Sequence, residues 1–391
     1  MKRIFFLLYS MGVGGVEKAL LGLLSIIPLD KYEVHVGLIN KEGGFLSLLP
    51  KEVKIHEINC YKKYWQLLNS TPFCAIKELL KKRLFKDALE FPFLYLWLYI
   101  LHKNAFNQYG LYKFLLKNEP TFPCFFDLAV SFAGPSRMID YYICEKVKAT
   151  RKCSWIHFDV SKINIDKEMI IQLYKQFDRI FIVSETGKEI FDKIFPQFTD
   201  KTMLFHNVVL QEQILRMADT APTFNDYFDG KRILTVGRLS EEKGQRVAID
   251  ALNILLNKGH KVKWYFVGDG EDRDCCEQLA AEYGISDKVE FLGLQTNPYG
   301  YMRDCDVYVQ PSRHEGFCIT LAEALCFGNP IVATNFTGAP EQLRNRENGI
   351  VVGMSSEEIA IGVISGLEMG LVEANTLSCD DDLSKLFDLL E

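Results

Sequence analysis

The stretch RILTVGRLSEEKGQRVAIDALNILLNKG, at residues 232–259, joins an apolar run, a polar loop and a periodic apolar run. In its last part, five apolar residues share one helical face: Val247, Ala248, Ala251, Leu252 and Leu255. Gly259 follows them, and glycine is the usual residue just after the end of a helix. The stretch therefore predicts a strand, a polar loop and a helix, the repeating unit of a parallel α/β sheet.

The same alternation continues in both directions along the chain. Downstream lie the runs VKWYFVG, VEFLG, VYVQ and IVAT, with helices expected at 273–283 and 319–327. Upstream lie RIFFLLY, VHVGLI, VKIHEI, FDLAVSF, CSWIHF and RIFIVS, with a helix expected from residue 16. Short strands separated by helices indicate parallel sheets with crossover helices. Because 391 residues exceed what one core usually serves, the chain is predicted to be α/β, with two Rossmann-like domains facing across a cleft.

The division between the two domains is expected where periodicity is lost, in the polar residues 211–230. The predicted parts are an N-terminal acceptor-binding domain (1–208) with an insertion at 77–118, a linker (209–229), a C-terminal donor-binding domain (230–375) and a tail (376–391). Sheets of this kind bind ligands at the carboxyl ends of their strands. The cleft between the domains is therefore the expected site.

The bulk properties exclude several classes of protein. A formal net charge of -6 argues against a nucleic-acid partner. Eleven cysteines without a CxxC pair suit a reducing compartment. The apolar run at the N-terminus is too short for a signal peptide, and the longest apolar block, residues 91–101, is too short to span a bilayer, which takes about 20 residues. A cytoplasmic protein without a transmembrane helix is expected.

The stretch GVGGVEK, at residues 12–18, lies between the first predicted strand and helix. It has Glu17 where a dinucleotide-binding fingerprint would have its third glycine, which weakens a dehydrogenase interpretation. A glycine turn at a helix N-terminus can offer backbone N–H groups to an anion or to sugar hydroxyls. The alternative is a turn with a structural role only.

Two cations, Arg238 and Lys243, follow the strand at residues 233–236 and precede the next helix. Fixed positive charges at the mouth of a sheet suit a diphosphate, although most surface charges are simply solvated. Two carboxylates, Glu315 and Glu323, belong to the stretch RHEGFCITLAEALCFG. A pair of carboxylates can cleave glycosidic bonds. Here, however, Glu315 is expected in a loop and Glu323 in a helix, and a glycosidase would leave both cations without a role.

Together, GRLSEEKG, GDGED, DVYVQPSRHEGF and the Glu-x7-Glu pair followed by AEALCFGNPIVAT resemble the large retaining glycosyltransferase family of GT-B fold often called family 4. The resemblance spans most of the C-terminal half. The N-terminal half matches more loosely, through GGVEK and VSETGKEIF. Two departures from the family pattern are the absence of a glycine after Asn207 and a short C-terminal segment.

The resemblance implies a role for each matching residue. Arg238 and Lys243 would hold the donor phosphates, Glu323 the ribose hydroxyls, and Glu315 the transferred sugar. His157, in SWIHFD, would reach that sugar from the N-terminal domain, although a lone histidine after a strand is more often a core residue. The implied catalytic set is Arg238, Lys243, Glu315 and His157. The implied donor-binding set is Gly15, Gly237, Arg238, Lys243, Gly316, Phe317 and Glu323, in which Gly316 and Phe317 act through their backbone N–H groups.

No metal or cofactor is expected beyond the nucleotide sugar, which is a substrate. Metal-dependent transfer needs a carboxylate cluster, and the two Asp-x-Asp triplets, at residues 272–274 and 304–306, are expected to be structural because one lies in a turn and the other begins a strand. Arginine, lysine and a helix N-terminus would instead stabilise the charge that develops on the leaving phosphate.

A basic aromatic stretch lies between Lys77 and Lys117. It holds eight basic residues (Lys77, Lys81, Lys82, Arg83, Lys86, Lys103, Lys113, Lys117) and three acidic ones (Glu78, Asp87, Glu90). These residues surround a run of aromatic side chains, Phe91, Phe93, Tyr95, Trp97 and Tyr99. Such a stretch suits the anionic inner face of a membrane, and the acceptor would then be lipid-linked. The alternative is a helical insertion packed on the N-terminal domain.

The sequence thus predicts a retaining glycosyltransferase that moves a hexose or N-acetylhexosamine from a nucleotide diphosphate sugar to a hydroxyl of a glycan or lipid-linked acceptor. Assembly of a surface polysaccharide or glycoconjugate is the expected setting. The alternatives are a sugar-nucleotide epimerase or hydrolase of the same fold, and a non-catalytic protein that binds nucleotide sugars.

Overall fold

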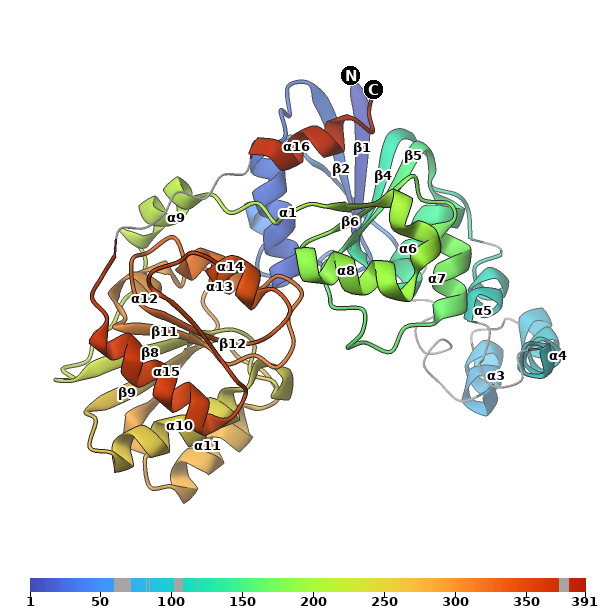
Figure 1. Ribbon diagram of the computed structural model, residues 1–391. Coiled ribbons are helices and arrows are strands. Elements are labelled where there is room, and N and C mark those ends of the chain that lie inside the picture. Colours follow the sequence, from blue (N-terminus) through green and yellow to red (C-terminus); the bar gives the residue numbers. More distant parts are fainter. Residues whose placement is uncertain (60–71, 82, 84, 102–107, 118, 373–379) are drawn as a thin grey trace. The chain divides into compact units, whose positions relative to one another are not determined.

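The computed structural model describes residues 1–391 except 60–71, 82, 84, 102–107, 118 and 373–379 (Figure 1). The chain divides into two compact units. Unit 1 comprises Met1–Ile182, Phe191–Met203 and Ser384–Glu391, and unit 2 comprises Val183–Ile190 and Leu204–Leu383. Each unit is built on one parallel sheet, so the predicted α/β class with two Rossmann-like domains is confirmed.

The sheet of unit 1 has seven strands in the order β3-β2-β1-β4-β5-β6-β7. The strands are β1 (Lys2–Leu8), β2 (Tyr32–Leu38), β3 (Lys54–Glu57), β4 (Phe125–Gly134), β5 (Lys148–Ile156), β6 (Arg179–Ile182) and β7 (Thr202–Leu204). The helices are α1 (Gly15–Ile26), α3 (Pro72–Lys81), α4 (Phe85–Leu101), α5 (Gln108–Leu115), α6 (Arg137–Lys146), α7 (Lys167–Tyr174), α8 (Glu185–Ile194) and α16 (Asp380–Phe387), of which α8 and α16 each cross a boundary between the units.

The sheet of unit 2 has six strands in the order β10-β9-β8-β11-β12-β13. The strands are β8 (Lys231–Val236), β9 (Val262–Val267), β10 (Val289–Gly293), β11 (Val307–Gln310), β12 (Ile331–Thr334) and β13 (Gly349–Val352). The helices are α9 (Gln211–Ala218), α10 (Gln245–Asn257), α11 (Arg273–Glu282), α12 (Tyr299–Asp304), α13 (Ile319–Ala324), α14 (Ala339–Leu343) and α15 (Ser356–Glu368).

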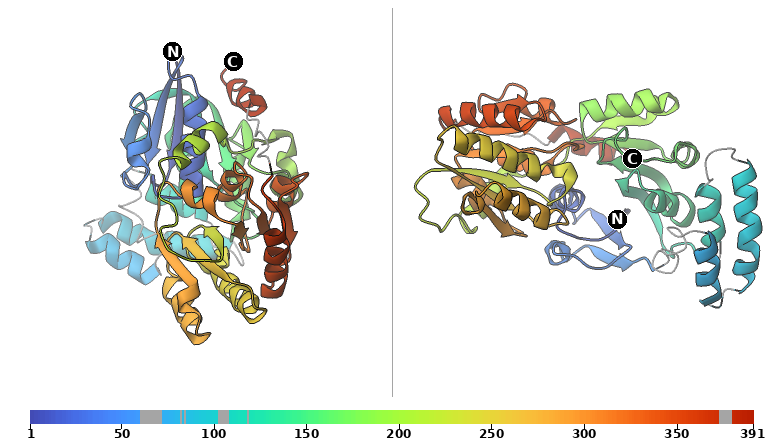
Figure 2. Two further views of the ribbon diagram at one scale, coloured as in Figure 1. Left: turned by 90° about the vertical axis from the view of Figure 1, so that its left-hand side faces the viewer. Right: turned by 90° about the horizontal axis from the view of Figure 1, so that it is seen from below.

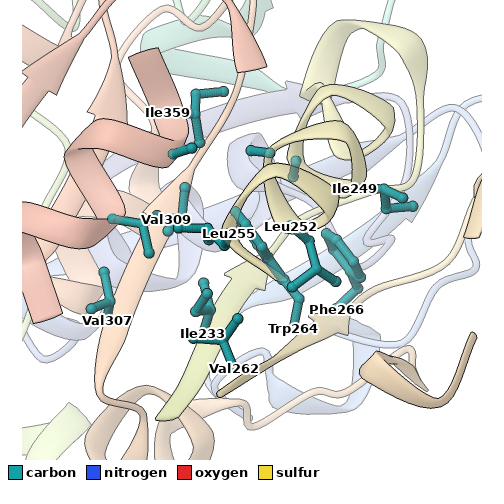
Figure 3. Close-up of a cluster of buried hydrophobic side chains, with 14 of the residues drawn as sticks. Ile233, Ile249, Leu252, Leu255, Val262, Trp264, Phe266, Val307, Val309 and Ile359 are labelled. Carbon is teal, nitrogen blue, oxygen red and sulfur yellow. The ribbon is translucent and has the colours of Figure 1, made fainter. Parts of the chain in front are cut away.

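The core of unit 2 is formed where α10 and α15 pack on the central strands (Figure 3). Leu252 and Leu255 of α10 meet Ile359 of α15 over Ile233 and Val309, and all five side chains are fully or almost fully buried. Trp264 of β9 is buried with them, and its indole N–H donates to the Thr235 hydroxyl at 3.0 Å. The helical face predicted for residues 247–255 is thus largely the face that packs on the sheet.

Both sheets reverse their strand order at one point, between β1 and β4 in unit 1 and between β8 and β11 in unit 2. In a doubly wound sheet the crevice at such a reversal, beyond the carboxyl ends of the strands, is where ligands bind. The loop after β8 contains Arg238 and Lys243, and the loop after β11 contains Glu315. The topology therefore brings the loops that contain Arg238, Lys243 and Glu315 to one crevice.

The structure adds detail at three predicted boundaries. The predicted linker, 209–229, contains helix α9, whose last carbonyls are capped by Asn297 Nδ2 at 3.0 Å and by the Arg303 guanidinium at 3.1 Å. The first unit 2 residue after β6 and α8 is Leu204, five residues before the predicted linker. The helix predicted at 319–327 ends at Ala324.

The predicted tail, 376–391, contains α16. The last eight residues of the tail, Ser384–Glu391, belong to unit 1. There the Phe387 ring stacks on that of Tyr32 at 4.8 Å between centroids. Within the described part of the chain, no helix is long and apolar enough to cross a membrane.

Candidate active site

The loop between β8 and α10 is fixed by its glycines. Gly244 has a φ of +75°, and a Cβ there would lie 2.0 Å from the carbonyl oxygen of Pro311, so glycine is required. The Gln245 side chain donates to the Arg238 carbonyl at 2.9 Å, and the Gly237 N–H donates to Val267 O at 2.9 Å. The backbone of the loop is therefore rigid, while the exposed Arg238 side chain forms no ion pair with any described residue.

Lys243 points to the loop after β11, where its ammonium group contacts Glu315 Oε1 at 2.5 Å. The two side chains are only 19% and 11% exposed. Burial alone would lower the pKa of Lys243, but the charge of Glu315 and the hydrogen bond to it raise that pKa above its ordinary value. Lys243 is thus a fixed cation at the crevice.

The same oxygen of Glu315 is also held by a chain of polar groups. The Ser312 hydroxyl donates to Glu315 Oε1 at 2.9 Å, and Gln310 Nε2 donates to the Ser312 hydroxyl at 2.8 Å. Gln310 Oε1 in turn accepts from Tyr308 at 2.7 Å and from Thr320 at 3.2 Å. This chain was not predicted; its only sequence signal is a glutamine at the end of the apolar run VYVQ.

Gly316 and Phe317 turn the chain from this loop into α13. Both residues are buried, and neither of their amide N–H groups has a hydrogen-bond partner among the described residues. A Cβ on Gly338 would lie 3.0 Å from the carbonyl oxygens of both residues, so the chain passes close behind them. These two amides are therefore available to a ligand.

Glu323 lies inside α13 and is 2% exposed, so it is not an exposed helix residue. The Tyr299 hydroxyl donates to its Oε1 at 2.8 Å from helix α12. Burial and the negative charge of Glu323 raise the pKa of Tyr299 far above its usual value, which keeps this donor protonated. The separate positions predicted for Glu315 and Glu323, one in a loop and one in a helix, are confirmed.

The other two candidates, His157 and Gly15, belong to unit 1. His157 follows β5 and is 7% exposed, with its ring 4.8 Å from that of Phe132. Burial lowers the pKa of His157 to about 3, against a weaker opposing hydrogen bond to the Phe132 backbone, so the ring is neutral at pH 7. Its Nε2 has no hydrogen-bond partner among the described residues. Gly15 is the exposed first residue of α1, at the carboxyl end of β1.

The two Asp-x-Asp triplets take part in local ion pairs. Asp272 precedes α11 and pairs with Arg246, while Asp304 pairs with Arg303 at 2.7 Å and Asp306 with Lys231 at 2.8 Å. Among the described residues there is no group of three His, Cys, Asp or Glu side chains arranged to hold a metal ion. The carboxylates of these ion pairs thus have structural partners.

The chain is similar in sequence to known glycosyltransferases, over part or nearly all of its length. The model of the family "Glycosyl transferases group 1" matches residues 224–375. A Campylobacter jejuni N-acetylgalactosaminyltransferase, whose name gives a diphospho-undecaprenol acceptor, is 27% identical over 99% of this chain and 93% of its own. The Rhizobium meliloti lipopolysaccharide core biosynthesis glycosyltransferase LpsE is 32% identical over 33% of this chain and 37% of its own.

Solved glycosyltransferase structures share the fold of the whole chain. Staphylococcus aureus TarM has a TM-score of 0.68 at 12% identity and covers 100% of both chains. Anabaena HepE, solved with UDP and glucose, has a TM-score of 0.63 at 18% identity and covers 100% of this chain and 93% of its own. The chain therefore has the GT-B fold, and the family model and the relatives support a glycosyltransferase.

Proposed function

We propose that this protein is a retaining glycosyltransferase of family 4 that transfers a hexose or N-acetylhexosamine from a nucleotide diphosphate sugar to an acceptor hydroxyl. The observation that carries the proposal is the convergence of Lys243, Glu315 and the amides of Gly316 and Phe317 at the reversal of the unit 2 sheet. Fixed cations and unpaired N–H groups suit the charge that develops on a leaving diphosphate. Retention is inferred from the family resemblance.

In this proposal the donor lies along the crevice of unit 2. Arg238 and Lys243 bind the two phosphates, and a dianionic or trianionic diphosphate competes with Glu315 for the Lys243 ammonium group. Glu323 accepts hydrogen bonds from the ribose, and Glu315 faces the sugar. By the family resemblance, Gly15 is assigned to the donor phosphates and His157 to the transferred sugar. The His157 ring is neutral, and its Nε2, which has no partner among the described residues, can accept a hydrogen bond from a sugar hydroxyl.

The acceptor class is inferred from the relatives. One relative is named for a lipid-linked diphosphate acceptor and another for lipopolysaccharide core biosynthesis. We therefore infer a glycan or lipid-linked acceptor in the assembly of a surface polysaccharide or glycoconjugate. An epimerase, a hydrolase or a protein that only binds nucleotide sugars is not favoured. The relative that covers 99% of this chain and the one that covers 33% of it are both named as transferases.

A product assay tests the proposal. A panel of nucleotide sugars is first ranked by thermal shift, since a ligand at 100 times its Kd stabilises a protein by about 2.7 kcal/mol. The best donor is then incubated with lipid-linked acceptors in EDTA, and the anomeric proton of the product is examined by NMR. We expect transfer with the anomeric configuration of the donor. An inverted product would contradict retention, donor turnover without acceptor would favour the epimerase or hydrolase, and loss of rate in EDTA would contradict metal independence.

Tyr299 provides a sharper test of the ribose assignment. Tyr299→Phe removes only the hydroxyl that holds Glu323, and a hydrogen bond to a charged group contributes about 1.5–3 kcal/mol. We expect KM for the donor to rise about tenfold while kcat stays within about twofold, because Glu323 remains present but loses its orientation. Steady-state kinetics at saturating acceptor measures this split.

The matched control is Tyr301→Phe, which removes a hydroxyl from the same helix without touching Glu323. It should leave KM unchanged. Equal loss of kcat and kcat/KM in Tyr299→Phe would instead place its effect in the transition state, against a positioning role in donor binding.

A further inference from the structure

Helices α3 and α4 form a pair in the insertion between β3 and β4 (Figure 2). They pack against each other, and α4 also contacts α5. Ala75 and Leu79 of α3 and Ala88 and Phe91 of α4 are buried, and the Phe91 ring lies near that of Phe114 in α5. The two helices thus bury only some of their apolar side chains.

Both helices also carry exposed large apolar residues, which we call the apolar stripe: Phe73, Leu80, Phe85, Leu89, Phe93 and Leu96. On α4 the four members follow at intervals of four, four and three residues, so they share one side of the helix. Their exposed fractions are 64%, 71%, 73% and 56%. Isolated exposed apolar residues are ordinary on protein surfaces, but a continuous row along one helix marks an interaction site.

Positive charge accompanies the apolar stripe. Lys77 is exposed between Phe73 and Leu80 on α3, and the junction of the two helices reads KKRLFK at residues 81–86, with four cations in six residues. The nearby acidic residues offset only part of this cluster. Glu78 lies 3.7 Å from Lys81 and Glu90 lies 3.9 Å from Lys86, but Asp87 and Glu90 bind Lys117 more closely, at 3.1 and 2.8 Å. Cations beside an apolar row suit anionic head groups above an acyl layer.

The structure changes which side chains could serve as membrane anchors. Of the five aromatic residues predicted for this role, Phe91 is buried against Phe114, whereas Phe93 is exposed. Tyr95 is partly buried, and the side chains of Trp97 and Tyr99 lie outside the described residues. Lys82 and Lys103 also lie outside them. The leucines of the apolar stripe, which were not predicted as anchors, supply much of the exposed surface.

We propose that the apolar stripe is a docking surface for a bilayer that contains anionic lipid. The stripe would enter the boundary between head groups and acyl chains, while Lys77, Lys81, Arg83 and Lys86 contact lipid phosphates. The biological reason for docking rests on the proposed lipid-linked acceptor, but the physical argument rests on the helix pair alone. A second copy of the chain is the competing occupant, and the charge beside the stripe favours the lipid.

Sedimentation of the full chain with vesicles tests the proposal. The wild type should bind vesicles of phosphatidylcholine with phosphatidylglycerol at low salt, and at least about tenfold more weakly when phosphatidylglycerol is omitted. Leu89→Glu/Phe93→Glu should lower binding at least about tenfold, because it places two charges in the acyl boundary without altering the buried face. Ile361→Glu, at a 58% exposed position on α15, is the matched control and should bind like the wild type.

Two activity assays separate this proposal from the proposed function. Transfer to a short-chain, water-soluble acceptor should be unchanged in Leu89→Glu/Phe93→Glu, while transfer to an acceptor embedded in vesicles should fall with binding. If the wild type stays in the supernatant, if the double variant sediments like the wild type, or if the stripe instead drives dimerisation seen by light scattering, the membrane proposal is overturned. In each of these cases, transfer to the water-soluble acceptor can still be measured, so the proposed function is tested independently of membrane binding.

Discussion

Lys243→Ala is expected to lower kcat/KM for sugar transfer by about 10²–10³-fold, the usual effect of removing one group that stabilises a developing negative charge. The reason is the position of the ammonium group: it is 19% exposed, its pKa is raised, and it lies in the crevice at the reversal of the sheet. A nearby water cannot supply an equivalent fixed charge. Affinity for the nucleoside diphosphate alone should fall as well, which isothermal titration measures directly.

Lys258→Ala is the matched control, since Lys258 is an exposed lysine of the same unit, at the end of α10. It should leave transfer and nucleotide affinity unchanged. If Lys243→Ala folds normally and transfers sugar at the wild-type rate, the assignment of Lys243 to the donor phosphates is wrong.

The parts of this structure that the sequence predicted are those with a local signal. The strand and helix around residues 232–259 follow from periodicity within one segment, and the positions of Arg238, Lys243 and Glu315 follow from where each strand ends. Parallel topology then brings these loops to one edge of the sheet without further information.

What the sequence did not predict depends on side-chain direction and on contacts between distant segments. The hydrogen bond from Tyr299 to Glu323 joins residues of two different helices that are 24 positions apart in the sequence. The hydrogen-bond chain from Gln310 through Ser312 to Glu315 depends on the direction in which each side chain points. Helix α9 has only Ile214 and Ala218 buried, too short a pattern to identify within a polar segment. In α4, apolar residues occur on both faces, so composition could not distinguish the buried Phe91 from the exposed Phe93.

Single variants of Lys243 or Glu315 cannot separate a loss of stability from a loss of catalysis, because each residue stabilises the other in an ion pair. Breaking a buried pair costs 3–5 kcal/mol, and the partial exposure here reduces the expected loss of unfolding free energy to about 2–3 kcal/mol. Since the pKa of Lys243 is raised, this stabilisation is fully present below the ordinary lysine pKa and is lost only as the pH rises through the folded-state value. Glu315→Gln should therefore be less stable than the wild type throughout the neutral range.

A double-variant cycle separates stability from catalysis. Glu315→Gln should lower kcat for transfer about 10²-fold, because a neutral amide replaces the carboxylate that is proposed to face the sugar. Its affinity for the nucleoside diphosphate should not fall, because this ligand carries no sugar and no longer competes with a carboxylate for Lys243. Lys243→Met/Glu315→Gln should regain stability to within about 1 kcal/mol of the wild type, because no unpaired charge stays buried. Its transfer activity should nevertheless remain at the level of the weaker single variant. If activity returned together with stability, Glu315 would serve only to hold Lys243, and its proposed contact with the sugar would have to be abandoned.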